Sequence, residues 1–436
     1  MGESAVGVIR VSGPAALATV ATLLGPPTDL ARFPSHALRR VTLVDPATGA
    51  RVDEALCAVM RAPRSYTGED VVELSCHGSP ALLRLVTQRL VDAGARLATP
   101  GEFTRRAFLN GRLDLAQAEA VALLIGARTA RAVALAAQGL AGGLSTRVRE
   151  LREAVLDVVA GLEVALDFPE EGVGLDPGAA RKMIVRLRED VGLWLAAARR
   201  GGVVHSGVTV ALVGPANAGK SSLLNALLGH DRAIVSPVPG TTRDVVEGAI
   251  ALGGVAVRLL DTAGLETPRD AVEAEGVRRS RLAMDASDLL LVVLDGSTEP
   301  DASVLDETAG RARLVVKTKS DLVVHPAAAA LAGALSVSSL TGEGIATLLE
   351  GLADHVARRA GELGDEGGLV ATLRQIELLD SLHAALSAAG AALADAPVEA
   401  ALIELRQALG SVGAVLGLEV GDEVLDRIFS SFCLGK

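Results

Sequence analysis

One stretch of the chain carries the residue types that bind a nucleotide phosphate. Gly214 is followed by Gly219, Lys220 and Ser221 in the spacing G-x-x-x-x-G-K-S, between an apolar run at 208–213 and a segment with helical spacing. Glycines let the backbone turn tightly around a phosphate, amide N–H groups and the lysine supply positive charge, and the serine hydroxyl can bind Mg²⁺. A glycine-rich turn before a helix is the alternative. The agreement of strand, motif and helix favours a phosphate-binding loop.

Two downstream segments extend this pattern. Residues 239–244 (PGTTRD) follow the helix after the phosphate loop, and a threonine there can bind Mg²⁺ and contact the γ-phosphate. Residues 261–264 (DTAG) end an apolar run; the aspartate can hold Mg²⁺ through water and the glycine N–H can face the γ-phosphate. Each tetrapeptide is a weak signal alone. Their order and their positions after predicted strands make them strong together.

Residues 318–321 (TKSD) indicate which base is bound. The carboxylate of Asp321 can accept hydrogen bonds from N1–H and the exocyclic amine of guanine, a donor pair that adenine lacks. The usual motif is Asn-Lys-x-Asp, so Thr318 departs from it, and Ser338-Ser339 stands where Ser-Ala is commoner. We predict a preference for GTP over ATP of more than about tenfold, or about 1.4 kcal/mol.

The usual motif does not supply the residue that orients the attacking water. Many GTPases carry glutamine directly after Asp-x-x-Gly, and Leu265 occupies that position here. Glu273 lies nine residues past Gly264 in an acidic segment and is a candidate. A solvated helix face explains the same spacing, so the pattern by itself leaves both interpretations open.

Composition bounds the number of domains and the partners. The chain has 436 residues, which predicts two or three domains. A formal net charge of −11 and only 2% aromatic residues argue against a bulk electrostatic grip on nucleic acid and against base-stacking platforms, while a local basic groove stays open. The cysteines Cys57, Cys76 and Cys433 are too scattered for a disulfide framework or a zinc cluster. With neither leader nor membrane span in the sequence, we expect a soluble, cytoplasmic protein.

The hydrophobic pattern predicts a multidomain protein with α/β and all-α parts. Residues 1–112 alternate strands and helices, 113–203 have helical spacing, and 204–360 return to strand–helix alternation. That alternation predicts a mostly parallel sheet with helices on both faces. Helical spacing resumes in 361–436, after an acidic link. We expect the two helical blocks to pack together, with the nucleotide-binding domain inserted between them.

Short apolar runs predict strands in both α/β domains. In the N-terminal domain they are 6–11 and 55–60, with a helix at 82–92. In the nucleotide-binding domain they are 208–213, 245–251, 255–260, 289–294, 314–316 and 335–337, with helices at 277–284 and 345–357.

Three isolated features have open interpretations. The N-terminal domain carries polar clusters at 65–70 (SYTGED) and 73–78 (ELSCHG). In the second cluster His77 could be a catalytic base or a ligand, but a turn histidine with a local hydrogen bond is the favoured explanation. Trp194, on an apolar helix face, is expected to serve packing rather than function.

Together these residues resemble one family, the tRNA uridine-modification GTPases known as MnmE or TrmE, over essentially the whole chain. The most specific match is 427–436 (RIFSSFCLGK), which resembles the terminal F-C-[IL]-G-K signature of the family. Further matches are 65–74 (SYTGEDVVEL), 100–120 (PGEFTRRAFLNGRLDLAQAEA), 167–171 (DFPEE) and Asn217 in the phosphate loop. Family members usually have a further strand ahead of the segment that matches 5–10, and Thr318 and Glu266 differ from common family choices.

The resemblance implies a fold, partners and an activity. The family is homodimeric, with a folate-binding and dimerising N-terminal α/β domain and a helical domain interrupted by a Ras-like P-loop GTPase domain. It forms a heterotetramer with an FAD- and NADH-using partner, MnmG, which is expected to hold most of the tRNA. Together they add a carboxymethylaminomethyl or aminomethyl group to C5 of the wobble uridine (position 34) in certain tRNAs. The one-carbon unit comes from a tetrahydrofolate derivative (5-formyl- or 5,10-methylene-tetrahydrofolate), and potassium-dependent pairing of the GTPase domains couples GTP hydrolysis to this chemistry.

The resemblance also assigns roles to individual residues. Glu273 matches the water-orienting glutamate, and Cys433 matches the cysteine considered essential for modification, a packing cysteine being the alternative. The Mg²⁺ ligands correspond to Ser221 and Thr242; the K⁺ ligands to Asn217, Ser236, Val238 and Thr241; and the folate contacts to Arg10, Glu73, Arg112 and Lys436. The residues expected around GTP are Asn217, Ala218, Gly219, Lys220, Ser221, Ser222, Ser236, Pro237, Val238, Pro239, Gly240, Thr241, Thr242, Asp261, Thr262, Ala263, Gly264, Thr318, Lys319, Asp321, Ser338 and Ser339.

Two other functions compete with this one. The GTPase domain alone permits a ribosome-assembly or RNA-binding GTPase switch without one-carbon chemistry. A folate-dependent transferase with a regulatory GTPase domain is the other. The C-terminal signature and the N-terminal matches favour wobble-uridine modification. The sequence does not give the tRNA set, the folate oxidation state or the coupling between the GTP site and Cys433.

Overall fold

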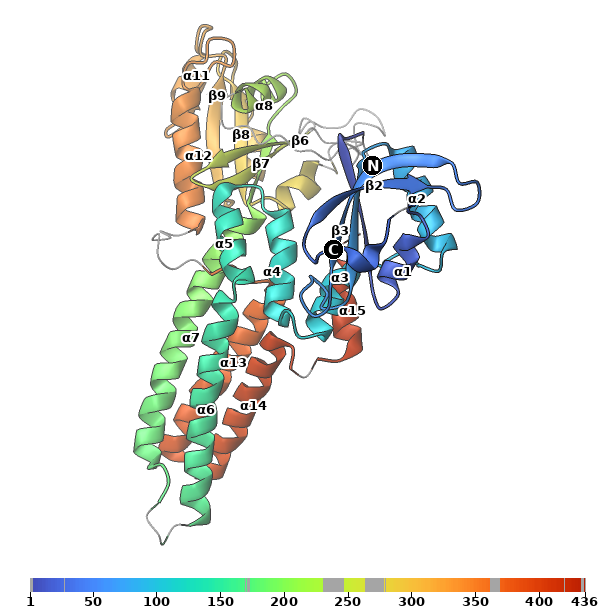
Figure 1. Ribbon diagram of the computed structural model, residues 1–436. Coiled ribbons are helices and arrows are strands. Elements are labelled where there is room, and N and C mark those ends of the chain that lie inside the picture. Colours follow the sequence, from blue (N-terminus) through green and yellow to red (C-terminus); the bar gives the residue numbers. More distant parts are fainter. Residues whose placement is uncertain are drawn as a thin grey trace. The chain divides into compact units, whose positions relative to one another are not determined.

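The structure is a computed structural model and describes residues 3–26, 28–168, 170, 173–229, 247–262, 278, 280–360, 369–418, 420–432 and 435. The chain divides into two compact units, each built from segments that are distant in sequence (Figure 1). Unit 1 comprises Met1–Ala122, Leu140–Ile184 and Ala384–Lys436, and unit 2 comprises Leu123–Gly139 and Val185–His383.

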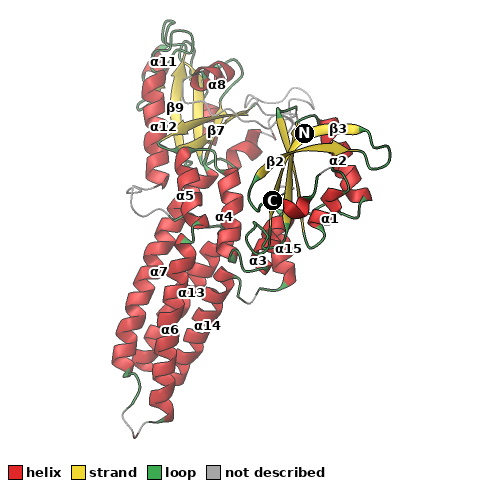
Figure 2. Ribbon diagram, in the orientation of Figure 1, coloured by secondary structure: helices red, strands yellow, loops and turns green. Residues whose placement is uncertain are grey.

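A four-stranded antiparallel sheet forms one layer of unit 1 (Figure 2). Its order is β1 (Val6–Ser12), β4 (Val71–His77), β3 (Arg51–Met60) and β2 (Leu38–Val44). Alternate residues, among them Val41, Cys57 and Leu74, point to one face and are buried against α1 (Ala16–Ala21) and α2 (Pro80–Asp92). The helices α1 and α2 therefore cover one face of this sheet.

The opposite face of the same sheet carries large apolar side chains in the open. Val6 and Val8 on β1, Leu38 on β2 and Leu56 on β3 are 58%, 59%, 64% and 44% exposed. Strand register joins them, because Val8 and Leu56 both pair with Ser75 of β4. Contiguous exposed apolar residues of this kind mark surfaces that contact a partner.

Two strands and one histidine of unit 1 differ from the sequence-based prediction. The strands β2 and β4 were not predicted. His77 is the last residue of β4, not part of a turn, and its hydrogen bonds are not local. Its Nδ1 lies 2.6 Å from Oδ1 of Asp53 on the neighbouring strand, and its N–H donates to Asp53 Oδ2 at 3.1 Å. The alternation of buried Val72, Leu74 and Cys76 with outward-facing Glu73 and Ser75 is the period-2 pattern of a half-buried strand, and the prediction overlooked it.

Helices from both predicted helical blocks pack together in unit 1. Helix α6 (Gly143–Asp167) buries Leu151, Val155, Val158 and Leu162 and runs beside α14 (Val398–Leu416). Arg406 of α14 donates to Glu163 of α6 at 2.8 Å. The C-terminal helix α15 (Asp422–Ser430) contacts α3 (Glu102–Leu109), and its Phe429 lies in a cluster with Leu115 of α4 (Leu115–Gly126).

Unit 2 contains a six-stranded sheet that is parallel except at one edge. Its order is β10 (Leu335–Ser336), β9 (Arg313–Thr318), β8 (Leu289–Asp295), β5 (Val208–Val213), β7 (Val255–Asp261) and β6 (Glu247–Leu252), and only β6 and β7 pair antiparallel among these strands. All six coincide with predicted strands to within a few residues. The prediction of a mostly parallel sheet is confirmed.

Helices cover both faces of this sheet, as its buried strands require. Val210 and Leu212 of β5 point to one face, where they pack with α8 (Lys220–Leu228), α12 (Ile345–Ala360) and α5 (Ala130–Leu140). Ala211 and Val213 point to the other face, where Val304 of α10 (Ala302–Glu307) packs. The carboxyl-terminal ends of β5, β7, β8 and β9 lie on the same side of the sheet. In sheets of this kind ligands bind on that side.

Two further long helices approach each other in unit 2. In unit 2, Gly192 of α7 (Pro177–Ser206) approaches the His383 ring of α13 (Leu373–Asp395). Trp194, on α7, is half-buried. Within the described part of the chain, α13 is the one helix long and apolar enough to cross a membrane, with a mean hydropathy of 1.2. Its Leu379, Leu382 and Leu386 are fully buried, as expected of a helix in a bundle.

Candidate functional site

The predicted phosphate loop joins β5 to α8 with the backbone that phosphate binding requires. Gly214 has no room for a side chain, because a Cβ there would lie 2.1 Å from the carbonyl oxygen of Val293 on β8. Asn217 and Gly219 have φ angles of 58° and 90°, a left-handed conformation that asparagine and glycine tolerate. Gly219 is the N-cap of α8, so the loop ends at a helix N-terminus whose free N–H groups attract anions.

The lysine of the loop is held at its centre. Lys220 is 8% exposed, and its Nζ donates to the carbonyl oxygens of Gly214 at 3.0 Å and Pro215 at 2.8 Å. Its positive charge therefore lies inside the concavity formed by the loop backbone. A phosphate entering this loop would meet one full charge together with the dipole of α8.

The residues proposed for Mg²⁺ lie next to the loop. The Ser221 hydroxyl donates to Oδ2 of Asp261, at the end of β7, at 2.5 Å. The other oxygen, Asp261 Oδ1, is buried and has no hydrogen-bond partner among the described residues. A hydroxyl and a carboxylate with a spare oxygen form a hard oxygen donor set that suits Mg²⁺. Thr262, the next residue, donates to the carbonyl of Leu212 and is buried, which fixes the end of β7 against β5.

Thr318 replaces the usual asparagine and joins two strands to the phosphate loop. Its side chain is 2% exposed, and its Oγ1 lies 2.6 Å from the carbonyl oxygen of Ala218 and 3.0 Å from that of Leu294. A hydroxyl has one proton to donate, so the two carbonyls share it. The threonine therefore keeps a direct link between the base-binding segment and the phosphate loop.

The carboxylate predicted to bind the base, that of Asp321, is held by a serine of the last predicted loop. Oδ1 of Asp321 accepts a hydrogen bond from the Ser338 hydroxyl at 2.5 Å, and Ser338 is completely buried. Ser339 follows it and is half-buried. Ser222 lies in the first turn of α8.

Part of the predicted GTP site lies outside the described residues. The residues concerned are Ser236, Pro237, Val238, Pro239, Gly240, Thr241, Thr242, Ala263, Gly264 and the candidate water-orienting Glu273. Their proposed roles remain predictions. The described residues bring together the phosphate loop, Asp261 and the base-binding segment, which is the core of a guanine nucleotide site.

A second cluster of predicted residues lies in unit 1, where Arg10 of β1 pairs with Glu73 of β4. Arg10 Nε donates to Glu73 Oε1 at 2.7 Å, and the pair lies on the exposed face of the sheet, in the same row as Leu38. The Arg10 guanidinium also lies over the rings of Tyr66, at 5.7 Å, and Phe103, at 5.5 Å. A cation, a carboxylate and two aromatic rings thus converge at one place.

The C-terminal end of the chain reaches this cluster. Arg10 Nη1 donates to the carbonyl oxygen of Gly435 at 3.4 Å. Packing of α15 explains the approach, because the rings of Phe429 and Phe432 lie with centroids 5.3 Å apart, tilted by 50°, and are buried beside α4. Arg105 of α3 adds an ion pair to Asp426 at 2.9 Å. Cys433 and Lys436 lie outside the described residues.

Arg112, the third residue assigned to folate, lies near the cluster without touching its acidic member. Its Nε donates to the carbonyl oxygen of Ser65 at 3.1 Å, immediately before Tyr66 in the chain. Tyr66 in turn bonds to Thr104 of α3 at 2.9 Å between their hydroxyl oxygens. The predicted residues Arg10, Glu73 and Arg112 are thus connected through the loop that carries Tyr66.

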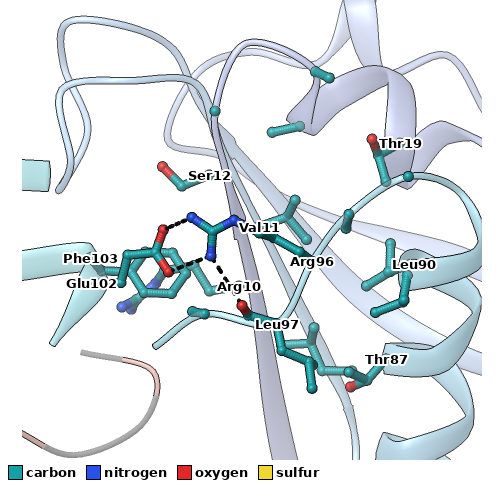
Figure 3. A pocket seen from close by; sticks show the side chains of 18 of the residues that line it. Arg10, Val11, Ser12, Thr19, Thr87, Leu90, Arg96, Leu97, Glu102 and Phe103 are labelled. Carbon is teal, nitrogen blue, oxygen red and sulfur yellow. Dashed lines mark hydrogen bonds and ion pairs between the residues drawn. The ribbon is translucent and has the colours of Figure 1, made fainter. Parts of the chain in front are cut away.

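A cavity of about 300 Å³ lies beside β1 and is lined by residues of α2 and α3, with Arg10 and Phe103 of the cluster in its wall (Figure 3). Its other charged residues, Arg96, Glu102 and Arg106, are joined through Glu102. Glu102 binds the Arg96 guanidinium at 2.8 and 2.5 Å and Arg106 at 2.7 Å, and Arg106 also reaches Glu69 at 2.9 Å. Hydrogen bonds lower the pKa of Glu102 to about 2. Those from Arg96 have the largest effect, burial opposes it in part, and bonds from Thr99 and Arg106 add to it. This ion network fixes α3 to the sheet, and the charges of Arg96, Glu102 and Arg106 are balanced by the ion pairs within it.

The two described cysteines are structural. Cys57 and Cys76 lie in the core beside α1 and α2, fully and almost fully buried. Burial raises the pKa of each thiol to about 11, and Asp53 adds to the effect at Cys76. Neither forms a thiolate readily near neutral pH.

Sequence reasoning missed three residues that the structure places in these sites. Tyr66 and Phe103 flank Arg10, and Asp295 at the end of β8 binds Lys319. For Asp295 a signal existed, because it is a carboxylate at the carboxyl end of a predicted parallel strand. Tyr66 and Phe103 lie in the segments 65–74 and 100–120 that resemble the family, but no spacing in the sequence indicates that the two rings meet at Arg10.

Comparison with protein families covers the chain almost from end to end. Residues 1–112 match the model described as GTP-binding protein TrmE N-terminus, and residues 115–433 match the MnmE helical domain. A tRNA modification GTPase MnmE from Moorella thermoacetica is 42% identical over 450 aligned positions, covering 100% of this chain and 97% of the relative. The protein of the same name from Carboxydothermus hydrogenoformans is 40% identical, with the same coverage.

Solved structures match in part. Era from Aquifex aeolicus bound to GDP and AlF4⁻ covers 41% of this chain and 66% of its own, with 23% identity and a TM-score of 0.29. The G domain of the T. maritima FeoB iron transporter covers 35% of this chain and 99% of its own, with 29% identity and a TM-score of 0.27. These scores are too low to carry the assignment, which depends on the full-length relatives. The chain belongs to the MnmE family of tRNA modification GTPases and hydrolyses GTP in tRNA modification.

Proposed function

We propose that this chain is a potassium-dependent GTPase that works with an FAD-dependent partner, MnmG, on the wobble uridine of certain tRNAs. The product carries a carboxymethylaminomethyl or aminomethyl group at C5, and a tetrahydrofolate derivative donates the one-carbon unit. The observation that supports the proposal most directly is that Arg10 donates hydrogen bonds both to the Glu73 carboxylate and to the carbonyl oxygen of Gly435. A site for a small molecule in unit 1, separate from the nucleotide site of unit 2, is what a GTP-driven modification enzyme needs.

The nucleotide site accounts for GTP and Mg²⁺. Lys220 and the N-terminus of α8 would bind the phosphates, and Asp321 would accept hydrogen bonds from guanine. Ser221 and Asp261, with Thr242, would hold Mg²⁺, which neutralises phosphate charge when bound. Glu273 would orient the water, a task for which Leu265 has no hydrogen-bonding group.

Potassium would bind at the mouth of the phosphate loop. Of its proposed ligands Asn217, Ser236, Val238 and Thr241, only the first lies among the described residues, where it is exposed at the loop surface with a left-handed backbone. A monovalent cation there supplies the charge that an arginine finger supplies in other GTPases.

Folate chemistry is supported by the donor set around Arg10. A folate carries carboxylates, which suit Arg10, Arg112 and Lys436, and a pterin edge with N–H donors, which suits Glu73. The rings of Tyr66 and Phe103 offer flat surfaces beside these groups. Cys433, close in sequence to Gly435, is the proposed catalytic cysteine.

A homodimer and a cytoplasmic location complete the proposal. The exposed apolar face formed by Val6, Val8, Leu38 and Leu56 suits a second copy of the same domain. The candidate folate residues Arg10 and Glu73 share this face, so dimerisation would shield them from water. The net charge of −11 agrees with a partner that holds most of the tRNA.

Potassium dependence is tested by measuring GTP hydrolysis by the full-length chain in KCl and in NaCl at equal ionic strength. We expect kcat to be higher in KCl by about tenfold or more, because the cation adds charge stabilisation in the transition state. Asn217→Ala should remove most of this difference. Equal rates in the two salts would overturn the potassium mechanism, while leaving GTP binding unaffected.

A further inference from the structure

The guanine-binding segment is anchored to the end of β8 by two consecutive residues. Thr318 and Asp295 are paired in the strand register of β9 and β8, and the Gly296 N–H donates to the Thr318 carbonyl at 3.0 Å. The next residue, Lys319, has a φ angle of 57°, which is unfavourable for a lysine and requires support from its surroundings.

The carboxylate of Asp295 supplies that support. Lys319 Nζ donates to Asp295 Oδ2 at 2.5 Å, and the Asp295 side chain is only 15% exposed. Its other oxygen, Oδ1, accepts from the N–H of Ser297 at 2.9 Å and from the Ser297 hydroxyl at 2.6 Å. Burial opposes the charged carboxylate, but the bonds from Lys319 and Ser297 outweigh it and lower the pKa of Asp295. Oδ2 of Asp295 therefore binds Lys319, and Oδ1 binds Ser297 in the local turn.

We propose that Asp295 is a positioning residue for guanine binding, which acts by fixing the Lys319 side chain beside the base. With its ammonium held by Asp295, the aliphatic stem of Lys319 is fixed in one conformation between the base-binding loop and the end of β8. An immobilised apolar stem gives a flat purine a preformed surface, and no side-chain freedom is lost when the base binds. The inference depends on the proposed role of the 318–321 segment in binding guanine.

The test separates the effect of the Lys319–Asp295 hydrogen bond from that of the Ser297–Asp295 bonds. In Asp295→Asn the amide oxygen still accepts from Ser297, but the amide nitrogen cannot accept from Lys319. We expect the dissociation constants for fluorescent GDP and GTP to rise about five- to tenfold in the full-length protein, equally for both nucleotides, since both contain guanine. KM for GTP should rise by the same factor with kcat unchanged. Ser297→Ala, which removes a bond to the other oxygen, and Glu299→Gln, an exposed residue nearby, are the controls and should change affinity less than about twofold.

A double-mutant cycle decides whether Asp295 acts through Lys319. In a Lys319→Met background, Asp295→Asn should have no further effect on affinity. An equal loss in both backgrounds would overturn the inference, because Asp295 would then act through the fold of the loop. A loss for Lys319→Met with none for Asp295→Asn would also overturn it. If Lys319→Met itself leaves GDP and GTP affinity unchanged, the proposed guanine site fails instead.

Discussion

Replacing Lys220 with alanine should lower kcat/KM for GTP hydrolysis by about 10³-fold. Lys220 Nζ lies in the loop concavity on the carbonyl oxygens of Gly214 and Pro215, and the residue is buried. Alanine keeps the helical backbone of α8 and removes the charge that would stabilise the transferred phosphoryl group. Because that charge acts in a site shielded from water, its loss has a large effect on the transition state.

The measurement is steady-state GTP hydrolysis by the full-length protein, with circular dichroism to show that the variant is folded. Lys182→Ala is the matched control, because Lys182 lies exposed on α7 and belongs to no proposed site. Hydrolysis by Lys220→Ala within a few-fold of the unchanged protein would mean that the 214–221 loop is not the phosphate site.

The second large effect is expected for Asp321→Asn, which should weaken GTP binding by about 100- to 1,000-fold. The carboxylate accepts from two guanine donors, whereas an asparagine amide presents a donor to one of them. Xanthine has a carbonyl oxygen in place of the guanine amine, and the new amide can donate to it. The same variant should therefore bind xanthosine triphosphate more tightly than the unchanged protein does.

Competition of GTP and xanthosine triphosphate against a fluorescent nucleotide measures both changes. Asp354→Asn on the exposed side of α12 makes the same charge change away from the site. Unchanged GTP affinity, or a loss of GTP affinity with no gain for xanthosine triphosphate, would contradict the role of Asp321 in base recognition.

The nucleotide site could be predicted because each of its parts is local in sequence. The phosphate loop, the Asp261 segment and the Thr318–Asp321 segment each follow a mostly apolar strand, and in a parallel sheet the carboxyl ends of such strands meet on the same side. Strand order was not needed for that conclusion.

Contacts that depend on strand order or on distant pairing could not be predicted. Asp295 and Lys319 are 24 residues apart and meet because β8 and β9 are neighbours in the sheet. Arg10 and Gly435 are 425 residues apart, and only the packing of α15 on α3 and α4 brings them together. The family resemblance pointed to Arg10 and the C-terminus, but not to their hydrogen bond.

The departure at Thr318 also has a physical explanation that the sequence alone did not provide. Asparagine is usual at that position. In the structure the threonine hydroxyl links Ala218 and Leu294 across two strands from a fully buried position. A small β-branched residue suits the end of a buried strand, and its hydroxyl is sufficient for the link.

We propose that this chain uses GTP hydrolysis to modify the wobble uridine of tRNA. The most direct test of this proposal is mass spectrometry of tRNA nucleosides from a strain that lacks the gene, complemented with either the unchanged gene or the Lys220→Ala variant. We expect the uridine at position 34 to be unmodified at C5 in the deletion strain, modified again with the unchanged gene, and unmodified with Lys220→Ala. Normal modification in the deletion strain, or full restoration by Lys220→Ala, would contradict the claim.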